Sequence, residues 1–558
     1  MIGWWRSRRG LSPRRVSSCC PSKRCAFPLV RLPFAPPLPL LSGGKGRGQR
    51  GGRGTAPLMP PTVAVVGGGI SGLAACYHLL RAPRPPKVVL LEASGRFGGW
   101  LQSTRTPEGA VFEHGPRGVR PAGPAGAETL HMVSELGLAG DILAVPRDHP
   151  AARNRFLYLG GALHPLPSGL WAVLRAVPPF QRALLWSALR DLLTPAGTGP
   201  DESAHAFARR RFGPEVAELA VDSLCRGVFA GDSRALSVRS CFPALFQAER
   251  RRGSVLLGLA LPHGGTLGTL LGLALPHGVA AGDGGAGPGA ALARRARAER
   301  WSQWSLRGGM ESLARALVAF VSPRGAELRC HSPLTHLGRH RGRWQLTLPD
   351  ATLAADHVVS ALPASALARA LPAEAEPLAR ELRAIPAASV AVVNLQYEGA
   401  ALPVTGFGHL VPSSEDPALL GIVYDSVAFP EHDGTPATPG TPSLRLTVML
   451  GGAWFRQSFG DPALVAPELL LRRARAAVSD HLGLAGTPAR AIVRVQQDCI
   501  PQYTLGHWER LERIQRFLKE QELPLSLIGA SYSGVSVNDC IASAKAAVGR
   551  ILGSLPEA

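Results

Sequence analysis

The residues with the clearest capacity for chemistry are glycines that follow an apolar segment just after the basic N-terminal sixty residues. The run Thr62–Val66 is followed directly by Gly67, Gly68, Gly69 and, two positions later, Gly72. The first glycine allows a tight turn, the third lets a phosphate approach the backbone, and the last permits close packing of a helix on a strand. A helix that begins here presents free N–H groups to a phosphate. The spacing therefore predicts a dinucleotide-binding turn.

An acidic side chain stands where a nucleotide ribose would need one. A second apolar run, Lys87–Leu91, ends at Glu92, twenty residues beyond Gly72, and a carboxylate there can accept hydrogen bonds from ribose hydroxyls. The order of strand, glycine turn, helix, strand and acid favours dinucleotide binding over an ordinary tight turn. We expect the dinucleotide to contact Gly67, Gly68, Gly69, Ile70, Ser71, Gly72, Glu92 and Ala93.

Two further segments indicate that the dinucleotide is FAD. The segment Arg96–Trp100 contains Gly98 and Gly99, and it resembles the second glycine pair of the FAD-dependent amine oxidase superfamily. Near the other end of the chain, Leu525–Ala530 has the pattern of a buried strand and is followed by a helical pattern over Asn538–Leu552. In that superfamily the corresponding helix directs its N-terminus at the flavin, where its dipole stabilises negative charge on the reduced ring.

A finer resemblance covers nearly all of residues 62–552. Eight segments are similar to those of the protoporphyrinogen oxidase family: Gly67–Ala75, Gly115–Gly123, Asp148–Ala152, Asn154–Tyr158, Asp222–Gly231, Ala298–Gly309, Gly406–Pro417 and Asp498–Trp508. The chain departs from the family's animal members in its basic N-terminal segment and in a repeated insertion. The resemblance implies an enzyme that oxidises protoporphyrinogen IX to protoporphyrin IX in haem biosynthesis.

The resemblance implies one non-covalently bound FAD in each chain. It adds further flavin contacts from Trp100, Gly115, Pro116, Arg117, Gly118, Leu334, Ala530, Val535, Ser536 and Val537. The residue types agree in part with these roles, because glycines permit close backbone approach and Arg117 offers a cation to phosphate or flavin oxygens.

For the substrate, the resemblance implies a flat tetrapyrrole surrounded by Arg155, Leu224, Phe407, Gly408, Leu410, Val423 and Met449. A large apolar disc needs aromatic and aliphatic contacts. Its propionates need a cation, and Arg155 can bind one carboxylate through two parallel hydrogen bonds.

The implied reaction removes six electrons in three two-electron steps. Each step passes a hydride to FAD, and dioxygen reoxidises the flavin to give hydrogen peroxide. Because the flavin performs this chemistry, we expect no catalytic acid or base among the side chains. The sixteen histidines show no metal-ligand spacing, so we expect no metal site.

Three alternatives stay open on the sequence alone. A flavin amine oxidase of the same fold commonly places a lysine near the flavin, whereas no lysine lies between Lys87 and Lys519. A carotenoid desaturase would suit an apolar pocket but would not need Arg155. A catalytically silent protein that keeps FAD, or only the fold, is the third hypothesis, and an absorption spectrum followed by a porphyrin fluorescence test would separate it from the enzymes.

The composition fits a multi-domain globular enzyme. The 558 residues are 46% hydrophobic and 18% charged. Residues 1–60 hold twelve Lys or Arg and no acid, so the net charge of +21 falls to +9 in the body, with 49 basic and 40 acidic residues. This charge does not indicate a nucleic-acid-binding surface. The six cysteines of the body are far apart and favour reduced, buried thiols over disulfides.

The elements that position these residues predict an α/β fold. We expect a Rossmann-like FAD-binding domain that is split in the sequence, a sheet-based substrate domain and a helical membrane-associating lobe. The FAD-binding parts are residues 61–149, 299–362 and 491–558, the lobe is 150–298, and the substrate domain is 363–490. Helical spacing over Pro165–Arg211 indicates the lobe, and the substrate sheet is indicated by strand patterns at Ser389–Tyr397, Gly421–Tyr424 and Leu444–Leu450.

Two segments have open interpretations. Residues 1–60 have the composition of a mitochondrial presequence, and an upstream extension that is not translated is an equal alternative. The insertion at residues 253–291 repeats the sequence LLGLALPHG at Leu256–Gly264 and Leu270–Gly278. It is either a flexible surface loop or a loop that dips into a membrane surface.

The sequence favours attachment to a membrane without crossing it. No run of eighteen apolar residues without helix breakers occurs. The poorly soluble substrate and the apolar lobe predict peripheral attachment. The resemblance implies the inner mitochondrial membrane, on the side of the intermembrane space. A homodimer and transfer of product to ferrochelatase are partner hypotheses, but the residues do not reveal oligomeric state, import route or transfer.

Overall fold

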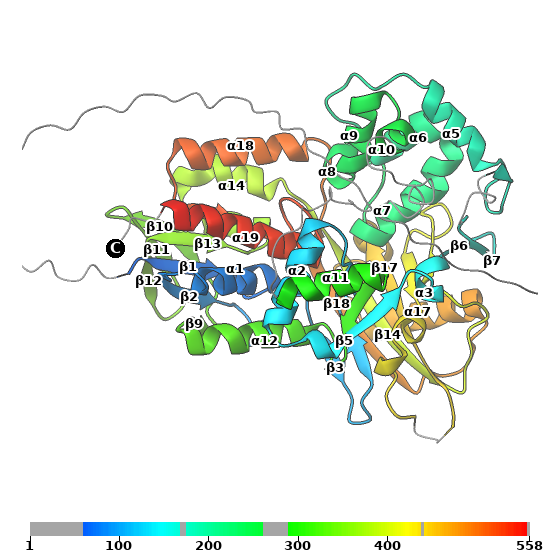
Figure 1. Cartoon of the computed structure of the whole chain (residues 1–558), viewed down its shortest axis with the longest axis horizontal. Helices are drawn as coiled ribbons and strands as arrows, with labels where there is room; N and C mark the ends of the chain where they lie inside the picture. The colour runs from blue at the N-terminus through cyan, green and yellow to red at the C-terminus, as the bar shows by residue number, and fades with distance from the viewer. Residues whose placement is uncertain (1–59, 168–173, 261–287, 437–439, 555–558) are drawn as a thin grey trace, which may run out of the picture. The chain divides into compact units, whose positions relative to one another are not determined.

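The nucleotide-binding part is built on a five-stranded parallel sheet. The computed structural model describes residues 60–167, 174–260, 288–436 and 440–554 (Figure 1). The strand order is β19 (Leu525–Leu527), β13 (His357–Ser360), β1 (Thr62–Val66), β2 (Lys87–Leu91) and β9 (Glu327–Arg329), and every neighbouring pair is parallel. Three separate parts of the chain therefore form one sheet, whose carboxyl edge is the usual place for a nucleotide.

Helices and a small sheet cover both faces of this sheet. Val63 and Val65 face a cluster formed with α1 (Ile70–Leu80), α2 (Gly123–Glu135), α11 (Pro288–Ala298), α12 (Glu311–Val321) and α19 (Val537–Ser554). Ala64 and Val66 face the opposite cluster, formed with α13 (Ala364–Ala370), α14 (Glu376–Arg383), α18 (His507–Glu520) and the antiparallel strands β10 (His336–His340), β11 (Arg343–Thr347) and β12 (Thr352–Ala355). Burial on both faces explains why β1 and β2 are apolar after their first residues, Thr62 and Lys87.

A second sheet has seven strands. Their order is β18 (Arg490–Pro501), β14 (Ala387–Glu398), β17 (Ser443–Gly452), β16 (Leu419–Val423), β15 (Gly408–Leu410), β6 (Phe156–Leu159) and β7 (Ala162–Pro165). All neighbouring pairs are antiparallel except β15 with β6. One face, with Ala391 and Val393, packs with α17 (Pro467–Leu482). The opposite face carries Val392 and its cross-strand partner Met449.

A group of helices follows the first strands of the second sheet. It contains α5 (Leu184–Leu193), α6 (Ala204–Phe212), α7 (Asp222–Phe229), α8 (Val238–Cys241), α9 (Pro243–Arg252) and α10 (Val255–Ala260). Phe207, Phe229 and Phe246 are buried in its apolar cluster. This is the predicted helical lobe, and none of the helices among the described residues is long and apolar enough to cross a bilayer.

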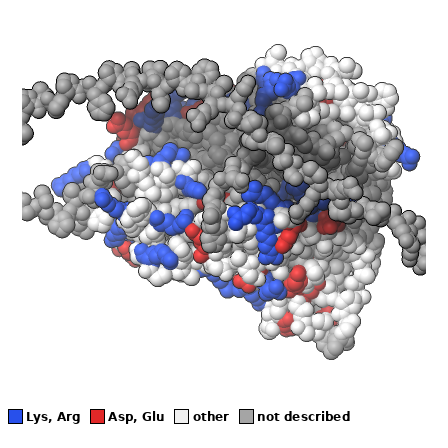
Figure 2. Space-filling view, in the orientation of Figure 1, with Lys and Arg blue, Asp and Glu red and all other residues white. Residues whose placement is uncertain are grey.

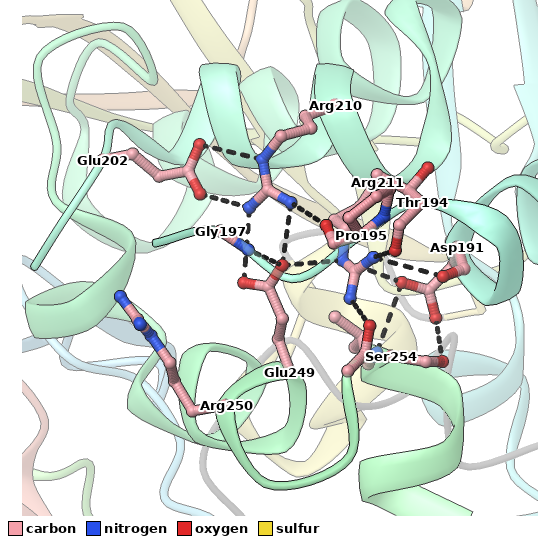
Figure 3. A network of polar contacts seen from close by, with 12 residues as sticks. Asp191, Thr194, Pro195, Gly197, Glu202, Arg210, Arg211, Glu249, Arg250 and Ser254 are labelled. Carbon is pink, nitrogen blue, oxygen red and sulfur yellow. Dashed lines mark hydrogen bonds and ion pairs between the residues drawn. The ribbon is translucent and has the colours of Figure 1, made fainter. Parts of the chain in front are cut away.

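A buried network of charges holds the helical lobe together (Figure 3). The fully buried Arg211 places its Nε 3.2 Å from Asp191 Oδ1 and 3.0 Å from Glu249 Oε1. Arg210 pairs with the same Glu249 at 2.8 Å and also with Glu202. Because these residues lie on α5, α6 and α9 and just before α6, the network fixes the three helices relative to one another.

The same network fixes the start of α10. Asp191 accepts hydrogen bonds from Ser254 Oγ at 2.6 Å and from the Leu256 N–H at 2.9 Å (Figure 3). A carboxylate at the start of a helix satisfies N–H groups that have no partner within the helix. The described residues of the repeated insertion include α10, whereas residues 261–287 and 1–59 lie outside the described residues.

Four segments lie in a different part of the fold from the one that the predicted boundaries gave them. Helices α13 and α14, assigned to the substrate domain, pack on the nucleotide-binding sheet. Strands β6 and β7, assigned to the lobe, and most of β18, assigned to the FAD-binding domain, belong to the seven-stranded sheet. Helix α11, also assigned to the lobe, packs on α2 through Leu292 and Ala296 in the nucleotide-binding part. The reason is physical: each of these segments pairs or packs with the sheet or helix nearest to it in space, which need not be its neighbour in sequence.

Candidate flavin and substrate site

The predicted glycine turn lies at the carboxyl end of β1. Gly67 has a φ of +102°, and its N–H donates to Leu91 O at 2.8 Å. The Gly68 N–H donates to Glu92 Oε2 at 2.7 Å, and the Gly98 N–H donates to Gly68 O at 2.8 Å. Glu92 therefore braces the turn in addition to standing at the expected ribose position.

Two glycines of this turn differ in what surrounds them. A Cβ at Gly72 would lie 1.9 Å from Gly67 O, so the packing of α1 on β1 requires glycine there. A Cβ at Gly69 would meet only Gly99 Cα, 3.9 Å away, and the Gly69 backbone, with φ −71° and ψ −177°, is open to any residue. The fold itself therefore leaves room beside Gly69, where a pyrophosphate would approach.

The start of α1 offers hydrogen-bond donors to an anion. No side chain caps this helix, and its first turn, which contains Ile70 and Ser71, has no acidic residue. The first N–H groups of a helix have no partner within the helix, and its dipole favours a negative charge there. The uncapped end thus fits the phosphates of a dinucleotide.

The C-terminal segment meets the same turn. A Cβ at Gly529 would lie 3.3 Å from Ser71 Oγ. The Tyr503 hydroxyl donates to Ala530 O at 2.5 Å and accepts from the Gly534 N–H at 2.8 Å. One phenol therefore fixes both ends of the turn that leads into α19, and the two ends of the polypeptide meet at the predicted cofactor site.

Helix α19 begins with a pair of reciprocal hydrogen bonds. The Ser536 Oγ accepts from the Asp539 N–H at 3.2 Å, and Asp539 Oδ2 accepts from the Ser536 N–H at 3.2 Å and from its hydroxyl at 2.6 Å. Val535 and Val537 flank this cap. Asp539 places a negative charge at the helix end that was expected to stabilise negative charge on the flavin, so part of the dipole's effect is already offset.

Trp100 and the loop at residues 115–118 lie together. A Cβ at Gly115 would lie 2.0 Å from Trp100 O, so the loop can pass this residue only as glycine. Val119 and Trp304 of β8 (Trp301–Leu306) exchange two backbone hydrogen bonds of 2.8 and 2.9 Å. Pro116, Arg117 and Gly118 are held between these two anchors, as flavin-contacting residues need to be.

Arg117 is joined to the second sheet through buried polar groups. Its Nη1 lies 2.8 Å from Asp425 Oδ1, and each side chain is 10% exposed. Asp425 Oδ2 accepts from Thr447 Oγ1 at 2.6 Å, and Asn394 Nδ2 donates to the same hydroxyl at 2.8 Å. Arg117 Nη2 is buried and has no hydrogen-bond partner among the described residues. This donor fits an oxygen atom of a flavin or phosphate.

Glu113 is a buried carboxyl that the sequence did not single out. It accepts hydrogen bonds from the Met310 N–H at 2.6 Å and from Ser103 Oγ at 2.8 Å. Burial raises its pKa to about 7, against the smaller lowering by these hydrogen bonds and by the charge of Arg117. The group therefore titrates near neutral pH just behind the flavin loop.

Four of the predicted substrate residues, Gly408, Leu410, Val423 and Met449, lie on strands of the second sheet. Leu224, Phe407, Leu410, Val423 and Met449 are half-buried, whereas alternate residues of the same strands, such as Ile422 and Val448, are fully buried on the other face. Gly408, with φ +145°, pairs with Val423, and a Cβ at Gly227 would lie 2.9 Å from Leu410 Cδ2. Helix α7 therefore packs on β15, and the strand register puts Gly408, Leu410, Val423 and Met449 on one face of the sheet.

The polar network and this apolar face are continuous. Val423 pairs with Thr447, and Met449 lies two residues further along the same strand, β17. Because residues two apart share a face of a strand, the apolar surface gives way to Thr447, Asp425 and Arg117 at one end. The predicted flavin loop and the predicted substrate face therefore adjoin.

Two arginines stand near this face. Arg155 directly precedes β6 and is half-buried, which lowers the pKa of its guanidinium. Arg120, which the sequence reasoning did not single out, lies in the segment after the flavin loop. Its pKa is lowered to about 10, first by burial and then by the charge of Arg155. The sequence shows Arg120 only as a second arginine within the segment Gly115–Gly123. The spacing of the segment does not predict a role for it.

Leu334 lies behind the ribose position. The Ser332 N–H donates to Glu92 O at 2.8 Å, so the segment after β9 runs beside the acidic residue. Leu334 packs at the margin of the cluster formed by β10 and α13, and Ala93 is exposed. A separate cavity of about 490 Å³, lined by residues that include Ile142 and Trp301, contains none of the predicted site residues.

A glycine turn of the dinucleotide-binding type, contacted by the segment around Gly529 and adjoining an apolar sheet face, fits an enzyme that binds a dinucleotide. The family described as flavin containing amine oxidoreductase matches residues 70–552. The protoporphyrinogen oxidase of Homo sapiens is 57% identical over 499 residues, which cover 89% of this chain and 100% of that protein. The chain therefore belongs to the flavin containing amine oxidoreductases and, within them, to the protoporphyrinogen oxidases.

More distant relatives show how far the fold extends. The coproporphyrinogen III oxidase of Bacillus subtilis is 26% identical over 508 residues, with 87% of this chain and 97% of that protein covered. The structure of cyclohexylamine oxidase from Brevibacterium oxydans matches with a TM-score of 0.58 at 15% identity, over 88% of this chain and 99% of that one. The latter likeness concerns the fold. The predicted α/β fold class and the predicted family are confirmed.

Proposed function

We propose that this protein is an oxygen-dependent enzyme that oxidises protoporphyrinogen IX to protoporphyrin IX, with one non-covalently bound FAD per chain. The observation that carries the proposal is the 57% identity to the human protoporphyrinogen oxidase over the whole length of that protein. The site supports the proposal, because an apolar face formed by several strands adjoins the predicted flavin loop.

The described residues fit an FAD. Gly69 leaves room for the pyrophosphate, the start of α1 offers N–H groups, and Arg117 Nη2 lacks an acceptor. When bound, FAD would take up a hydride in each of three two-electron steps and pass the electrons to dioxygen, which gives hydrogen peroxide.

The side chains bind and orient the substrate. Phe407, Leu410, Val423 and Met449 present apolar surface to the macrocycle and exclude water from it. Arg155 can take one propionate through two parallel hydrogen bonds and so fix the rotation of the disc. Positioning of this kind, rather than acid–base catalysis, is what the protein adds to hydride transfer.

Anaerobic addition of protoporphyrinogen IX to the purified holoenzyme tests this function. The flavin absorbance should bleach while porphyrin fluorescence appears, and dioxygen should restore the absorbance with release of hydrogen peroxide. Bleaching by a primary amine but not by the porphyrinogen would contradict the proposal in favour of an amine oxidase. A flavin that bleaches with neither compound would identify a silent flavoprotein.

We also propose that the helical lobe attaches the enzyme to a membrane surface through α5. Five large apolar side chains of this helix are exposed: Leu185, Trp186, Leu189, Leu192 and Leu193. Two exposed arginines accompany them: Arg182 precedes the helix, and Arg190 lies between Leu189 and Leu192. Figure 2 shows the surface over this part of the lobe as mostly uncharged, with scattered Lys and Arg and little Asp or Glu. An exposed apolar helix with nearby basic residues suits the interface of an anionic bilayer.

Sedimentation with anionic phospholipid vesicles tests the attachment. The double substitution Leu189→Asp, Leu193→Asp should release the protein from vesicles and leave flavin content unchanged. Leu464→Asp is the matched control, because Leu464 is as exposed as Leu193, 82% each, but lies outside the lobe. Equal binding by all three proteins would contradict a role of α5.

The location that the family resemblance implies is the inner mitochondrial membrane, on the side of the intermembrane space, and we propose it for this protein. Fractionated mitochondria provide the test. The protein should sediment with the inner membrane, be released by alkaline carbonate, and become accessible to added protease once the outer membrane is ruptured. Protection from protease after that rupture would place it in the matrix instead.

A further inference from the structure

Arg120 and Arg155 differ from the other enclosed arginines of this protein in having no partner. Arg211 pairs with Asp191 and Glu249. Arg226 and Arg445 donate to backbone carbonyls, and Arg445 also pairs with a carboxylate. Within the described residues, the guanidinium groups of Arg120 and Arg155 make neither a hydrogen bond nor an ion pair, although both are half-buried.

The charge of Arg155 also acts on the guanidinium group of Arg120. The charge of Arg155 lowers the pKa of Arg120 further than burial alone does, and no carboxylate acts in the other direction. Two like charges that are partly withdrawn from water and have no counter-ion are unfavourable in the protein without ligand. Such an arrangement is typical of a site that an anionic ligand completes.

Their backbones are held in place from both halves of the site. Val119, next to Arg120, exchanges hydrogen bonds with Trp304, and the carbonyl of Arg120 accepts from Asn538 Nδ2 at 2.9 Å. Arg155 directly precedes β6, whose Phe156 pairs with His409 of β15. One arginine therefore comes from the segment that follows the flavin loop, and the other from the segment that leads into the substrate sheet.

We propose that Arg120 and Arg155 form one dicarboxylate site, in which Arg120 takes the second propionate of the substrate that Arg155 holds by the first. This inference rests on the proposed function and gives it a specificity determinant. Two adjacent cations fit two adjacent propionates of one tetrapyrrole, because each guanidinium can bind one carboxylate through parallel hydrogen bonds. The pair would also set which edge of the disc faces away from the flavin.

The same chemistry, a pair of negative oxygens, also occurs in the pyrophosphate of the cofactor. The substrate and the cofactor can be distinguished by the property that changes when Arg120 is substituted. If the pair serves the substrate, Arg120→Met keeps its flavin and loses affinity for the dicarboxylate. If it serves the cofactor, Arg120→Met loses flavin, and that result would overturn the proposal.

The test compares the diacid with its dimethyl ester. For Arg120→Met, the KM for protoporphyrinogen IX should rise about 10- to 100-fold with a smaller change in kcat, and the KM for the dimethyl ester should not change. Arg120→Lys, which keeps the charge without the two parallel hydrogen bonds, should lie between. Arg153→Met is the matched control, because Arg153 is exposed two positions from Arg155 and should leave both values unchanged.

Thermal stability separates this role from a structural one. Because the unpaired cations repel each other, Arg120→Met should melt at or above the temperature of the wild type in the absence of ligand, and protoporphyrin IX should stabilise the wild type more than the variant. A fall in melting temperature, or an equal rise in KM for diacid and ester, would overturn the proposal. A wild type that turns over neither compound would instead contradict the proposed function itself.

Discussion

Gly69 and Gly72 lie in one turn but are glycine for different reasons. The packing of α1 against Gly67 O excludes any side chain at Gly72, whereas the fold tolerates one at Gly69. We therefore expect Gly69→Val to fold and to lose its flavin, since the side chain would fill the space that the pyrophosphate needs. The flavin absorbance that remains after gel filtration, and the melting temperature of the flavin-free protein, measure the two effects.

Gly72→Ala is the structural counterpart. Its methyl group would collide with a backbone oxygen, so we expect a loss of about 3 kcal/mol or more in the free energy of unfolding. Flavin binding should fall only as the fold does. A full complement of flavin in Gly69→Val would show that the cofactor does not pass this residue.

Glu113 gives a pH dependence with a defined sign. Its folded pKa of about 7 lies above the value of 4.5 expected in the unfolded chain, so the folded state binds a proton that the unfolded state releases. The stability that this bound proton contributes is fully present below pH 4.5 and is lost as the pH rises through 7. We expect Glu113→Gln to gain stability relative to the wild type between pH 5 and pH 8, by about 3 kcal/mol.

Urea unfolding at several pH values measures this difference. Glu374→Gln, which removes an exposed carboxylate, is the control for the loss of one charge. A difference between wild type and Glu113→Gln that stays constant across this range would mean that Glu113 is ionised in the folded protein throughout.

Local spacing predicted the residues whose partners are near in sequence. The turn at Gly67 and the acid at Glu92 follow from a strand, a glycine pattern and a second strand, all within about thirty residues. The contact of Arg117 with Asp425 joins residues 308 positions apart, and nothing in the local pattern of either reveals the other. Arg120 was missed for the same reason, since its role depends on Arg155 from another domain.

At the scale of elements, the helical lobe depends on charges that are fully buried. Arg211→Met would leave Asp191 and Glu249 without the cation that both contact. Removal of one partner from a buried ion pair costs about 3–5 kcal/mol. We expect the lobe to unfold at a lower temperature and to become the first site of limited proteolysis, while the flavin stays bound.

The exposed pair on α11 provides the comparison. Arg295 lies 2.8 Å from Glu299, and both side chains are about half exposed. Arg295→Met should therefore change the free energy of unfolding by no more than about 1 kcal/mol. Equal losses in the two variants would mean that burial of the Arg211 network contributes nothing to the lobe.

Strands with a clear apolar or alternating pattern could be predicted, whereas the four-residue strands β6 and β7 could not. The strand pattern at Ser389–Tyr397 corresponds to β14, and that at Leu444–Leu450 to β17, because alternation continues over many residues. The helical spacing over Pro165–Arg211 contains α5 and α6 but begins within β7. A strand of four residues carries too few alternations to be distinguished from a helical turn, so its place in the sheet is decided by its partners.

At the scale of the whole molecule, Arg117 and Asp425 connect the nucleotide-binding part to the second sheet. Thr447 and Asn394 hold Asp425 from the sheet side, while the flavin loop carries Arg117. A flavin that accepts a hydrogen bond from Arg117 Nη2 is therefore coupled to the face that holds the substrate. The two parts should gain stability together when FAD binds.

A double-mutant cycle measures this coupling. Asp425→Asn leaves the charge of Arg117 buried without a counter-ion, so we expect it to destabilise the flavin-free protein by about 3–5 kcal/mol. Arg117→Met alone likewise leaves the charge of Asp425 buried without a counter-ion. The double variant Arg117→Met, Asp425→Asn should recover part of the lost stability, because it contains neither charge. Flavin affinity should not recover in the double variant, since it lacks the Nη2 donor of Arg117, as Arg117→Met does. If the double variant bound flavin as the wild type does, Arg117 would serve only to join the two parts, and the flavin loop would hold its cofactor through backbone groups alone.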